Sequence, residues 1–347
     1  MKSFRLFLCV FALSLLNLRA FIGGIGQNDT FLLTLSINLL FLLGIDYRHY
    51  LKKFLFVGVL FPLVVYNREI LALIDILLCV YLFRNFPIKI LAFINLSLLL
   101  LGFLILTLLR GLDLLTVNQE VWYLTGKGAA QTYGFNNPNG FGGFVFTMIV
   151  NAYIVFLCFR RNLLPVLFLL LMAVVTYNYC LSRTLLVGTV VLVLVHFMVG
   201  WRVLKKWMRY FIALLPILFF LVNFYLVVNL SEFHEVNVLT SGRLSIYAGI
   251  LDTMTKLNWL IGIPLPEGPM DGSLWMLLFT GGIVGLLFFF VNFYFSVTRC
   301  FEELYIYFPA ILAVLVSGFV ENVFSGISGV SIIFWLLVCR FYTYKIT

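Results

Sequence analysis

The sequence predicts an all-α polytopic membrane protein with about 12 transmembrane helices and both termini cytoplasmic. Of its 347 residues, 63% are hydrophobic and only 11% are charged, and the mean hydropathy is +1.10. Because roughly a quarter of the residues in a soluble chain are charged, this composition excludes a soluble enzyme, a disordered protein and a secreted disulfide scaffold. One span takes ~20 residues, so we expect residues 1–347 to form a single integral membrane domain.

Twelve apolar runs are the candidate spans. They lie at about 4–22, 31–45, 54–66, 70–83, 87–109, 139–159, 163–180, 184–200, 210–230, 274–296, 307–320 and 327–339. The first run could pass for a signal sequence, but it continues into Arg19 without a small-residue cleavage site, so we expect a span. The third and fourth runs are separated only by residues 67–69. If they formed one span, the N-terminus would move outside.

The charges are unevenly distributed between the two faces of this layout. Sixteen of the 23 basic residues fall on the inner side, whereas ten of the 14 acidic residues fall on the outer side. Because Lys and Arg collect on the cytoplasmic side, this asymmetry sets the expected orientation. The inner loops are short and contain no glycine-rich phosphate loop, so nothing indicates ATP hydrolysis. The two long loops, about 110–138 and 231–273, are both outer, and we expect the function there.

Cysteine and histidine lack the spacing of a disulfide or metal site. The six cysteines are scattered in or beside apolar runs, as is typical of packing residues, and the three histidines lie far apart. We therefore expect no metal and no cofactor. Asp75 is the one clearly intramembrane charge. It has two interpretations, a proton site of a transporter or a structural group paired with a polar neighbour.

Arg183 is an outward-facing cation in a tight turn between two apolar runs, against the orientation rule. Tyr179 and Ser182 lie beside it in the sequence and supply hydroxyl groups. A guanidinium held at the membrane surface with such neighbours suits a phosphate oxygen. The alternative is an arginine that extends to the lipid headgroups.

Arg243 is a second outward-facing arginine, and it opens a predicted amphipathic helix on the membrane after the ninth span. The apolar residues that define this helix repeat at three and four residues and are Leu244, Tyr247, Leu251 and Met254. Ser241 is the expected N-cap, which would set Arg243 beside the free N–H groups of the first turn. Such a helix start is a ready anion site. The alternative is an interfacial helix whose arginine meets headgroups.

Asp271 lies at the outer lip of the span that begins near residue 274. Partial desolvation there would suit a general base, and the residue is equally suited to cap the helix. Earlier in the chain, Asn137 and Asn139 lie in an Asn-Pro-Asn-Gly turn that opens a span. Their amides could bind sugar hydroxyls, whereas close helix packing alone would explain the glycines that follow.

Four motifs in this order resemble the Wzy-type polysaccharide polymerases of the O-antigen ligase and polymerase superfamily. They are the turn at 137–140, Ser182-Arg183, Ser241-Gly242-Arg243, and the segment from Asp271 to Gly285. The ligases have His where this chain has Asp271, and this departure favours a polymerase over a ligase. The resemblance covers about 130–290, and the earlier spans match only in hydropathy.

The resemblance implies a membrane glycosyltransferase that uses neither metal nor nucleotide. It would join undecaprenyl-pyrophosphate-linked oligosaccharide repeat units into a capsule or O-antigen polysaccharide at the outer face of the bacterial cytoplasmic membrane. On this hypothesis Arg183 and Arg243 hold the pyrophosphate, and Asp271 deprotonates or orients the acceptor hydroxyl. The expected substrate-binding residues are Ser241, Ser182, Asn137, Asn139 and Tyr179. The family implies a chain-length regulator and a flippase as partners, and no nucleic acid.

Three other functions compete with this one. A flippase for lipid-linked oligosaccharides would also have about twelve spans, but it should show a charged intramembrane cavity and pseudo-repeats between its halves. Neither is visible in the sequence, where Asp75 stands alone. An O-antigen ligase would share the motifs, and a structural membrane subunit predicts that neither outer arginine matters.

Overall fold

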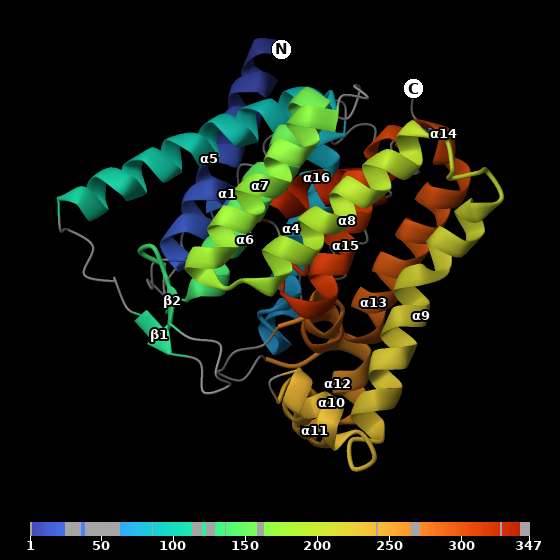
Figure 1. The fold of residues 1–347 in the computed structure, drawn as a ribbon. Coiled ribbons are helices and arrows are strands. Elements are labelled where there is room, and N and C mark those ends of the chain that lie inside the picture. The colour runs from blue at the N-terminus through green and yellow to red at the C-terminus, as the bar shows by residue number, and fades with distance from the viewer. Residues whose placement is uncertain are drawn as a thin grey trace.

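The computed structural model of the protein describes residues 2–24, 36–38, 63–84, 86–112, 120–122, 129–135, 137–157, 163–240, 242–264, 271–326 and 328–340. Most of them are helical (Figure 1). The long helices are α1 (Lys2–Gly24), α4 (Ile70–Phe83), α5 (Ile88–Gly111), α6 (Pro138–Ala152), α7 (Leu163–Cys180), α8 (Arg183–Gly200), α9 (Met208–Val228), α11 (Arg243–Thr253), α13 (Ser273–Arg299), α15 (Phe308–Val320) and α16 (Gly329–Val338). The short helices are α10 (His234–Leu239), α12 (Lys256–Ile261) and α14 (Phe301–Leu304).

Two irregular elements complete the described chain. A π-helical turn at Tyr153–Leu157 extends α6, and a 3-10 turn at Tyr305–Tyr307 leads into α15. The strands β1 (Glu120–Trp122) and β2 (Ala129–Gln131) pair antiparallel. This small sheet lies within the long loop at about 110–138, where the sequence predicted no strand.

The apolar helices make the chain an all-α, multi-pass membrane protein. Among the described residues, the six helices long and apolar enough to cross a membrane are Ile88–Gly111, Pro138–Phe156, Arg183–Gly200, Met208–Val228, Ser273–Arg299 and Phe301–Val320. Shorter apolar helices lie at Val10–Ile22, Ile70–Phe83, Leu164–Cys180 and Gly329–Val338. The predicted spans at 31–45 and 54–66 lie largely outside the described residues, so the count of twelve stays a prediction.

A turn at residues 67–69 separates α4 from the helical residues 63–66. Asn67 is fully buried, and its Nδ2 donates to the carbonyls of Ile261 (3.3 Å) and Thr280 (3.1 Å). Its Oδ1 accepts from the backbone N–H of Glu69 (3.1 Å). A turn thus lies at this point of the apolar sequence, and Asn67 joins it to α12 and α13. The division into two separate spans stays a prediction.

Helices α8 and α15 pack antiparallel along their length. The hydroxyl of Tyr305 donates to the carbonyl of Val199, near the end of α8 (3.3 Å), and Gly188 lies against Ser317. A Cβ at Gly188 would overlap the Ser317 hydroxyl, so only glycine permits this approach. The start of α8 and the end of α15 therefore lie at the same end of the bundle.

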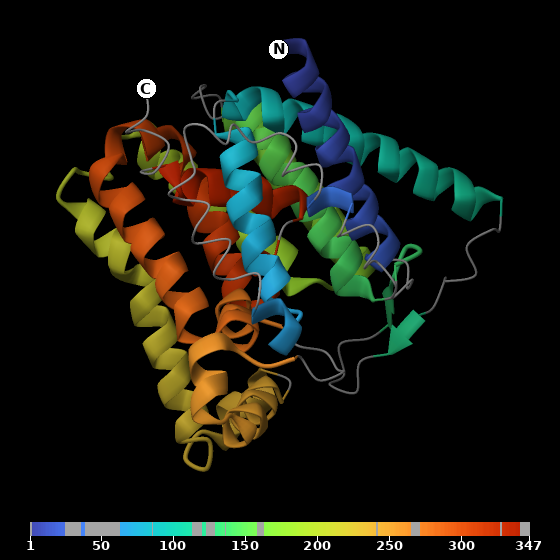
Figure 2. The same ribbon diagram turned by 180° about the vertical axis from the view of Figure 1, so that it is seen from behind.

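The bundle has two flanks and a central group. In Figure 1, α1, α5, α6 and α7 lie on one side, α9 and α13 lie on the other, and α4, α8, α15 and α16 lie between them. Figure 2, from behind, shows the same order with α4 towards the viewer. Both views set α10, α11 and α12 at one end and α14 at the other, the end where α1 begins.

Four helices of the bundle meet at the buried side chain of Asn95 in α5. Its Oδ1 accepts from Nδ2 of Asn17 in α1 (2.8 Å). Its Nδ2 donates to Oδ1 of Asn151 in α6 (3.2 Å) and to the carbonyl of Gly329 in α16 (2.5 Å). Because lipid offers no competing partners, such amide bridges are a main means of joining membrane helices.

Basic residues gather at the end of the bundle that carries α14. Lys206 pairs with Glu302 (3.3 Å), and Arg340 pairs with Glu303 (3.2 Å). The turns and helix ends of this region also carry Arg84, Lys89, Arg202, Lys205, Arg209 and Arg299. By the positive-inside rule this end is the expected cytoplasmic one.

Asp75 and the cysteines occupy packed positions. The buried carboxylate of Asp75 in α4 pairs with Arg19 of α1 (3.1 Å), which matches the structural interpretation of this residue. Four cysteines are buried, as the sequence predicted for packing residues; they are Cys79, Cys180, Cys300 and Cys339.

Candidate functional site

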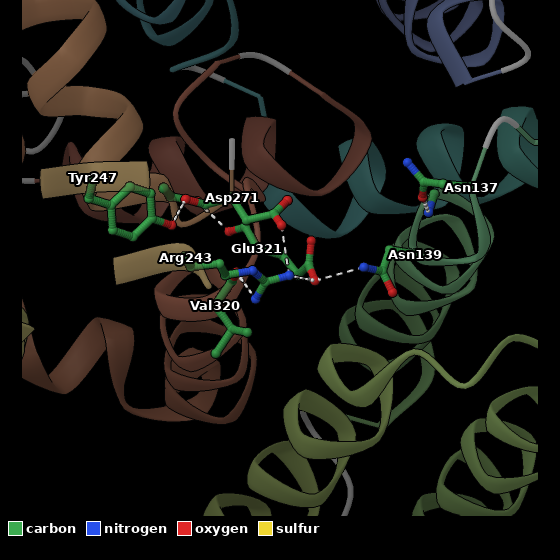
Figure 3. A network of polar contacts seen from close by, with 9 residues as sticks. Asn137, Asn139, Arg243, Tyr247, Asp271, Val320 and Glu321 are labelled. Atoms are coloured by element: carbon green, nitrogen blue, oxygen red, sulfur yellow. Dashed lines mark hydrogen bonds and ion pairs between the residues drawn. The ribbon is translucent and has the colours of Figure 1, made fainter. Parts of the chain in front are cut away.

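Side chains from four separate segments form one polar network around a guanidinium at the end of the bundle that carries α10–α12 (Figure 3). The guanidinium belongs to Arg243 in the first turn of α11. The other groups are Asp271 just before α13, Glu321 just after α15, and Asn139 in the first turn of α6. The site thus joins residues that the sequence separates by more than half of the chain.

Arg243 is paired with two carboxylates at once. Its NH2 lies 2.7 Å from Oδ2 of Asp271 and 3.1 Å from Oε1 of Glu321. Its NH1 donates to the backbone carbonyl of Val320 (2.9 Å). The predicted helix after the ninth span is confirmed, but its cap is Gly242, at φ +79°, rather than Ser241. Ser241 lies outside the described residues.

Asp271 lies one residue ahead of the cap of α13, because the helix begins at Ser273 after Gly272. No side chain caps this helix, and the Asp271 carboxylate instead contacts Arg243. The interpretation of Asp271 as a helix cap is therefore wrong. Its side chain belongs instead to the polar cluster of Arg243, Asp271, Glu321 and Asn139.

Glu321 is the member of the cluster that belongs to none of the sequence motifs. Its Oε1 accepts from Asn139 Nδ2 (3.1 Å) as well as from Arg243 (3.1 Å). Its backbone carbonyl accepts from the hydroxyl of Ser273 (3.1 Å). The sequence signal was available, since Glu321 follows directly on the apolar run at 307–320.

The close carboxylates change the proton affinity of the cluster. Burial and the negative charge of Asp271 raise the pKa of Glu321 to about 7, although Arg243 acts in the opposite direction. Burial disfavours the charged form of Arg243, but the attraction of Asp271 and Glu321 outweighs it and raises the pKa of the guanidinium. Burial and the neighbouring negative charge thus favour the protonated form of Glu321.

Tyr247, one helical turn after Arg243, fastens α11 to the start of α13. Its hydroxyl donates to the backbone carbonyl of Asp271, and its ring stacks on Trp275 with centroids 4.8 Å apart. Burial raises the pKa of the Tyr247 hydroxyl well above its ordinary value, so it remains a donor. Because positions i and i+4 share a helix face, this anchor also aims Arg243 at Asp271.

A break inside α13 makes room for α12 behind the cluster. Gly282 has φ +61° and ψ −160°, outside the helical range, and a Cβ there would overlap the backbone of Leu260. The N–H of Ile263 donates to the carbonyl of Phe279 (2.7 Å) next to the break. The two segments touch backbone to backbone, and Asn67 bridges them.

The predicted asparagines differ in their roles. Asn137 caps α6, because its side chain accepts from the N–H of Gly140 (2.6 Å) with Pro138 at the first helical position. Asn139 instead points to Glu321, as Figure 3 shows. The predicted turn opening a span is confirmed, and Asn139 belongs to the site.

Arg183, Ser182 and Tyr179 lie outside the contact network. Ser182 is buried against Gly142 of α6, whereas Tyr179 is 55% exposed. Arg183 is exposed, and in the part of the chain that the structure describes its side chain makes no hydrogen bond or ion pair. It lies at the start of α8, at the same end as Glu321, but does not touch the cluster.

Comparison with known proteins adds no further information on the site. No protein-family model, no curated protein and no solved structure matches the chain.

Within the described residues, no group of three or more His, Cys, Asp or Glu side chains could hold a metal ion. The arrangement is a guanidinium between two carboxylates, and this suits proton transfer and the binding of polar ligands.

Proposed function

We propose that the protein is a membrane glycosyltransferase of the polysaccharide-polymerase type. It joins undecaprenyl-pyrophosphate-linked oligosaccharide repeat units into a long polysaccharide at the outer face of the bacterial cytoplasmic membrane. The pyrophosphate leaving group supplies the energy, so the reaction needs no nucleotide.

The observation that carries this proposal is the carboxylate pair held by Arg243. Glycosyl transfer needs a group that takes a proton from the attacking hydroxyl, and such a group works best with a pKa near the working pH. Glu321 has a pKa of about 7 beside Asp271. Two neighbouring carboxyl groups are a recurring arrangement for acid and base chemistry on sugars.

The two arginines take different parts in the proposed reaction. The guanidinium of Arg243 already contacts Asp271, Glu321 and the Val320 carbonyl, so its first task is to hold the carboxylates. Arg183 is exposed at the same end, and it is the better candidate to bind the pyrophosphate and offset the charge that develops on it.

The charge distribution agrees with an outer site. The cluster lies at the end opposite the basic residues around α14, and the positive-inside rule assigns those to the cytoplasm. Lipid-linked repeat units that have already crossed the membrane would reach the site from the outer leaflet.

A polymerisation assay with purified protein in detergent tests the proposal. A defined undecaprenyl-pyrophosphate-linked repeat unit is the only substrate, and the products are separated by length on a gel. A polymerase yields a ladder, whereas a flippase yields none because detergent abolishes the two sides of the membrane. Arg243→Ala should lose the long products, with Lys205→Ala as a control at the opposite end. Undiminished long-chain polymer from a correctly inserted Arg243→Ala variant would contradict the proposed role of the site.

A further inference from the structure

Within the proposed glycosyl transfer, on which this inference rests, we propose that Glu321 and not Asp271 accepts the proton of the attacking hydroxyl. Asp271 then acts as a positioning residue that holds Arg243 and sets the proton affinity of Glu321. The inference follows from how the donors of the cluster are divided between the two carboxylates.

The contacts of Arg243 are unequal. Its NH2 is closer to Asp271 (2.7 Å) than to Glu321 (3.1 Å), and a short charge-assisted pair is the stronger one. Among the described residues, Arg243 and Asn139 both donate to Oε1 of Glu321, and the carboxyl group of Asp271 lies close enough for a hydrogen bond to that of Glu321. Neither Arg243 nor Asn139 reaches Oε2, and we assign the proton uptake to this oxygen.

The surroundings of Glu321 favour a group that gains and loses a proton near neutral pH. The side chain is 17% exposed, so it is largely desolvated and yet within reach of a substrate. The polar and charged groups that face it are Arg243 and Tyr247 from α11, Asp271 ahead of α13, and Asn139 from α6. Arg183 of α8 lies at the same end without a contact.

The proposed transfer forms one carbon–oxygen bond and breaks another. The acceptor hydroxyl oxygen forms a bond to the anomeric carbon of the donor sugar, and its proton moves to Oε2 of Glu321. The bond between the anomeric carbon and the pyrophosphate oxygen breaks, and its electron pair leaves with the lipid pyrophosphate. Glu321 then releases the proton to water, which restores its carboxylate for the next transfer.

The first measurement compares kcat for Glu321→Gln and Glu321→Asp with the unsubstituted protein in the detergent assay. Removal of a general base costs about 100-fold or more, so Glu321→Gln should lose at least that in kcat with little change in KM for the lipid-linked donor. Glu321→Asp should recover part of the rate. The control is Glu302→Gln, which removes an exposed carboxylate paired with Lys206 at the opposite end.

The second measurement separates Glu321 from Asp271 by pH. The rate of the unsubstituted protein should fall below pH ~7 as Glu321 takes up a proton. Asp271→Asn removes the neighbouring negative charge, so the acid limb should move to lower pH. If Asp271→Asn is too slow to profile, turnover restored to Glu321→Ala by added formate supports the same assignment.

The results of these measurements distinguish a role for Glu321 from a role for Asp271. A loss of less than tenfold in Glu321→Gln, an acid limb that Asp271→Asn does not move, or no rescue by formate overturns the role of Glu321. An active Glu321→Gln with an inactive Asp271→Asn assigns the proton transfer to Asp271. In each of these cases the unsubstituted protein still makes polymer, whereas failure of the proposed function itself is a protein that makes none.

Discussion

The guanidinium of Arg243 lies 2.7 Å from the carboxylate of Asp271, and this contact joins the first turn of α11 to the segment just ahead of α13. Tyr247 supports the same junction from the next turn of α11. The site is therefore held by an ion pair and a hydroxyl, and each of these can be removed separately.

Tyr247→Phe removes the hydroxyl that donates to the Asp271 carbonyl but keeps the ring on Trp275. We expect a loss of about 1 kcal/mol in unfolding free energy and a lower rate, because Arg243 is less well aimed. Thermal unfolding in detergent measures the first, and Tyr179→Phe, at an exposed tyrosine, is the matched control. Equal melting temperatures for the two variants would show that the hydroxyl does not hold the junction.

Glu321→Gln should change how stability depends on pH. The folded-state pKa of Glu321, about 7, lies above its ordinary value of 4.5. The folded protein therefore binds more protons between these values, and the stabilisation present below pH ~4.5 is lost as pH rises through ~7. Because Gln resembles the protonated form, the variant should melt about 2 °C or more above the unsubstituted protein at pH 8. The difference should vanish near pH 5, and a constant difference across this range would refute the assignment.

Arg183→Ala should weaken binding of the lipid-linked donor without disturbing the carboxylates. Its side chain makes no hydrogen bond or ion pair with the described residues, so the melting temperature should stay within about 1 °C, as for surface changes. KM for the donor should rise about tenfold or more, since bonds between charged groups contribute ~1.5–3 kcal/mol. Lys205→Ala is the control. An unchanged KM would support the alternative that Arg183 contacts lipid headgroups instead of the donor.

Gly282→Ala should be among the most damaging small substitutions. The added Cβ would overlap the Leu260 backbone at a positive φ, so α12 must move away from α13. We expect a loss of ~3 kcal/mol or more, by analogy with other strained or overpacked sites. Gly249→Ala in α11, where nothing lies within 4 Å of the new Cβ, should be neutral or slightly stabilising. Yield and melting temperature of the two variants give the comparison.

Asn95→Leu should loosen the contact among α1, α5, α6 and α16. It removes the bridges to Asn17, Asn151 and the Gly329 carbonyl, and interhelical hydrogen bonds in membranes contribute about 0.6 kcal/mol each. The expected total loss is ~2 kcal/mol, read as a lower melting temperature. Asn223→Leu is the control, because among the described residues the Asn223 side chain bonds to Phe219 of its own helix α9. Indistinguishable variants would contradict a joining role for Asn95.

The parts of the fold predicted from the sequence are those set by local pattern. Apolar runs fix where helices lie, and repeats at three and four residues predicted α11 with Arg243 at its start. Asp271 was recognised from its place at the lip of a span. The proximity of Glu321 could not be predicted in this way, because it depends on how α15 packs against α8 and α13.

The irregular backbone conformations at Gly242 and Gly282 could not be predicted from the sequence pattern either. Gly282 was recognised as part of a motif, but its positive φ follows from the insertion of α12 beside it. Ser241 was a reasonable cap by residue type, yet the chain enters α11 through Gly242. In both cases tertiary contacts, rather than local preference, decided the conformation.

The two carbonyls that Asn67 holds, those of Ile261 and Thr280, have a consequence for protein engineering. The motifs singled out in the sequence lie within about 130–290, but the scaffold of that region includes a side chain from far upstream, and Glu321 lies beyond its downstream limit. A chimera that exchanges only residues 130–290 with another chain would therefore separate Arg243 and Asp271 from both Asn67 and Glu321. Exchange boundaries placed before Asn67 and after Glu321 would keep them together.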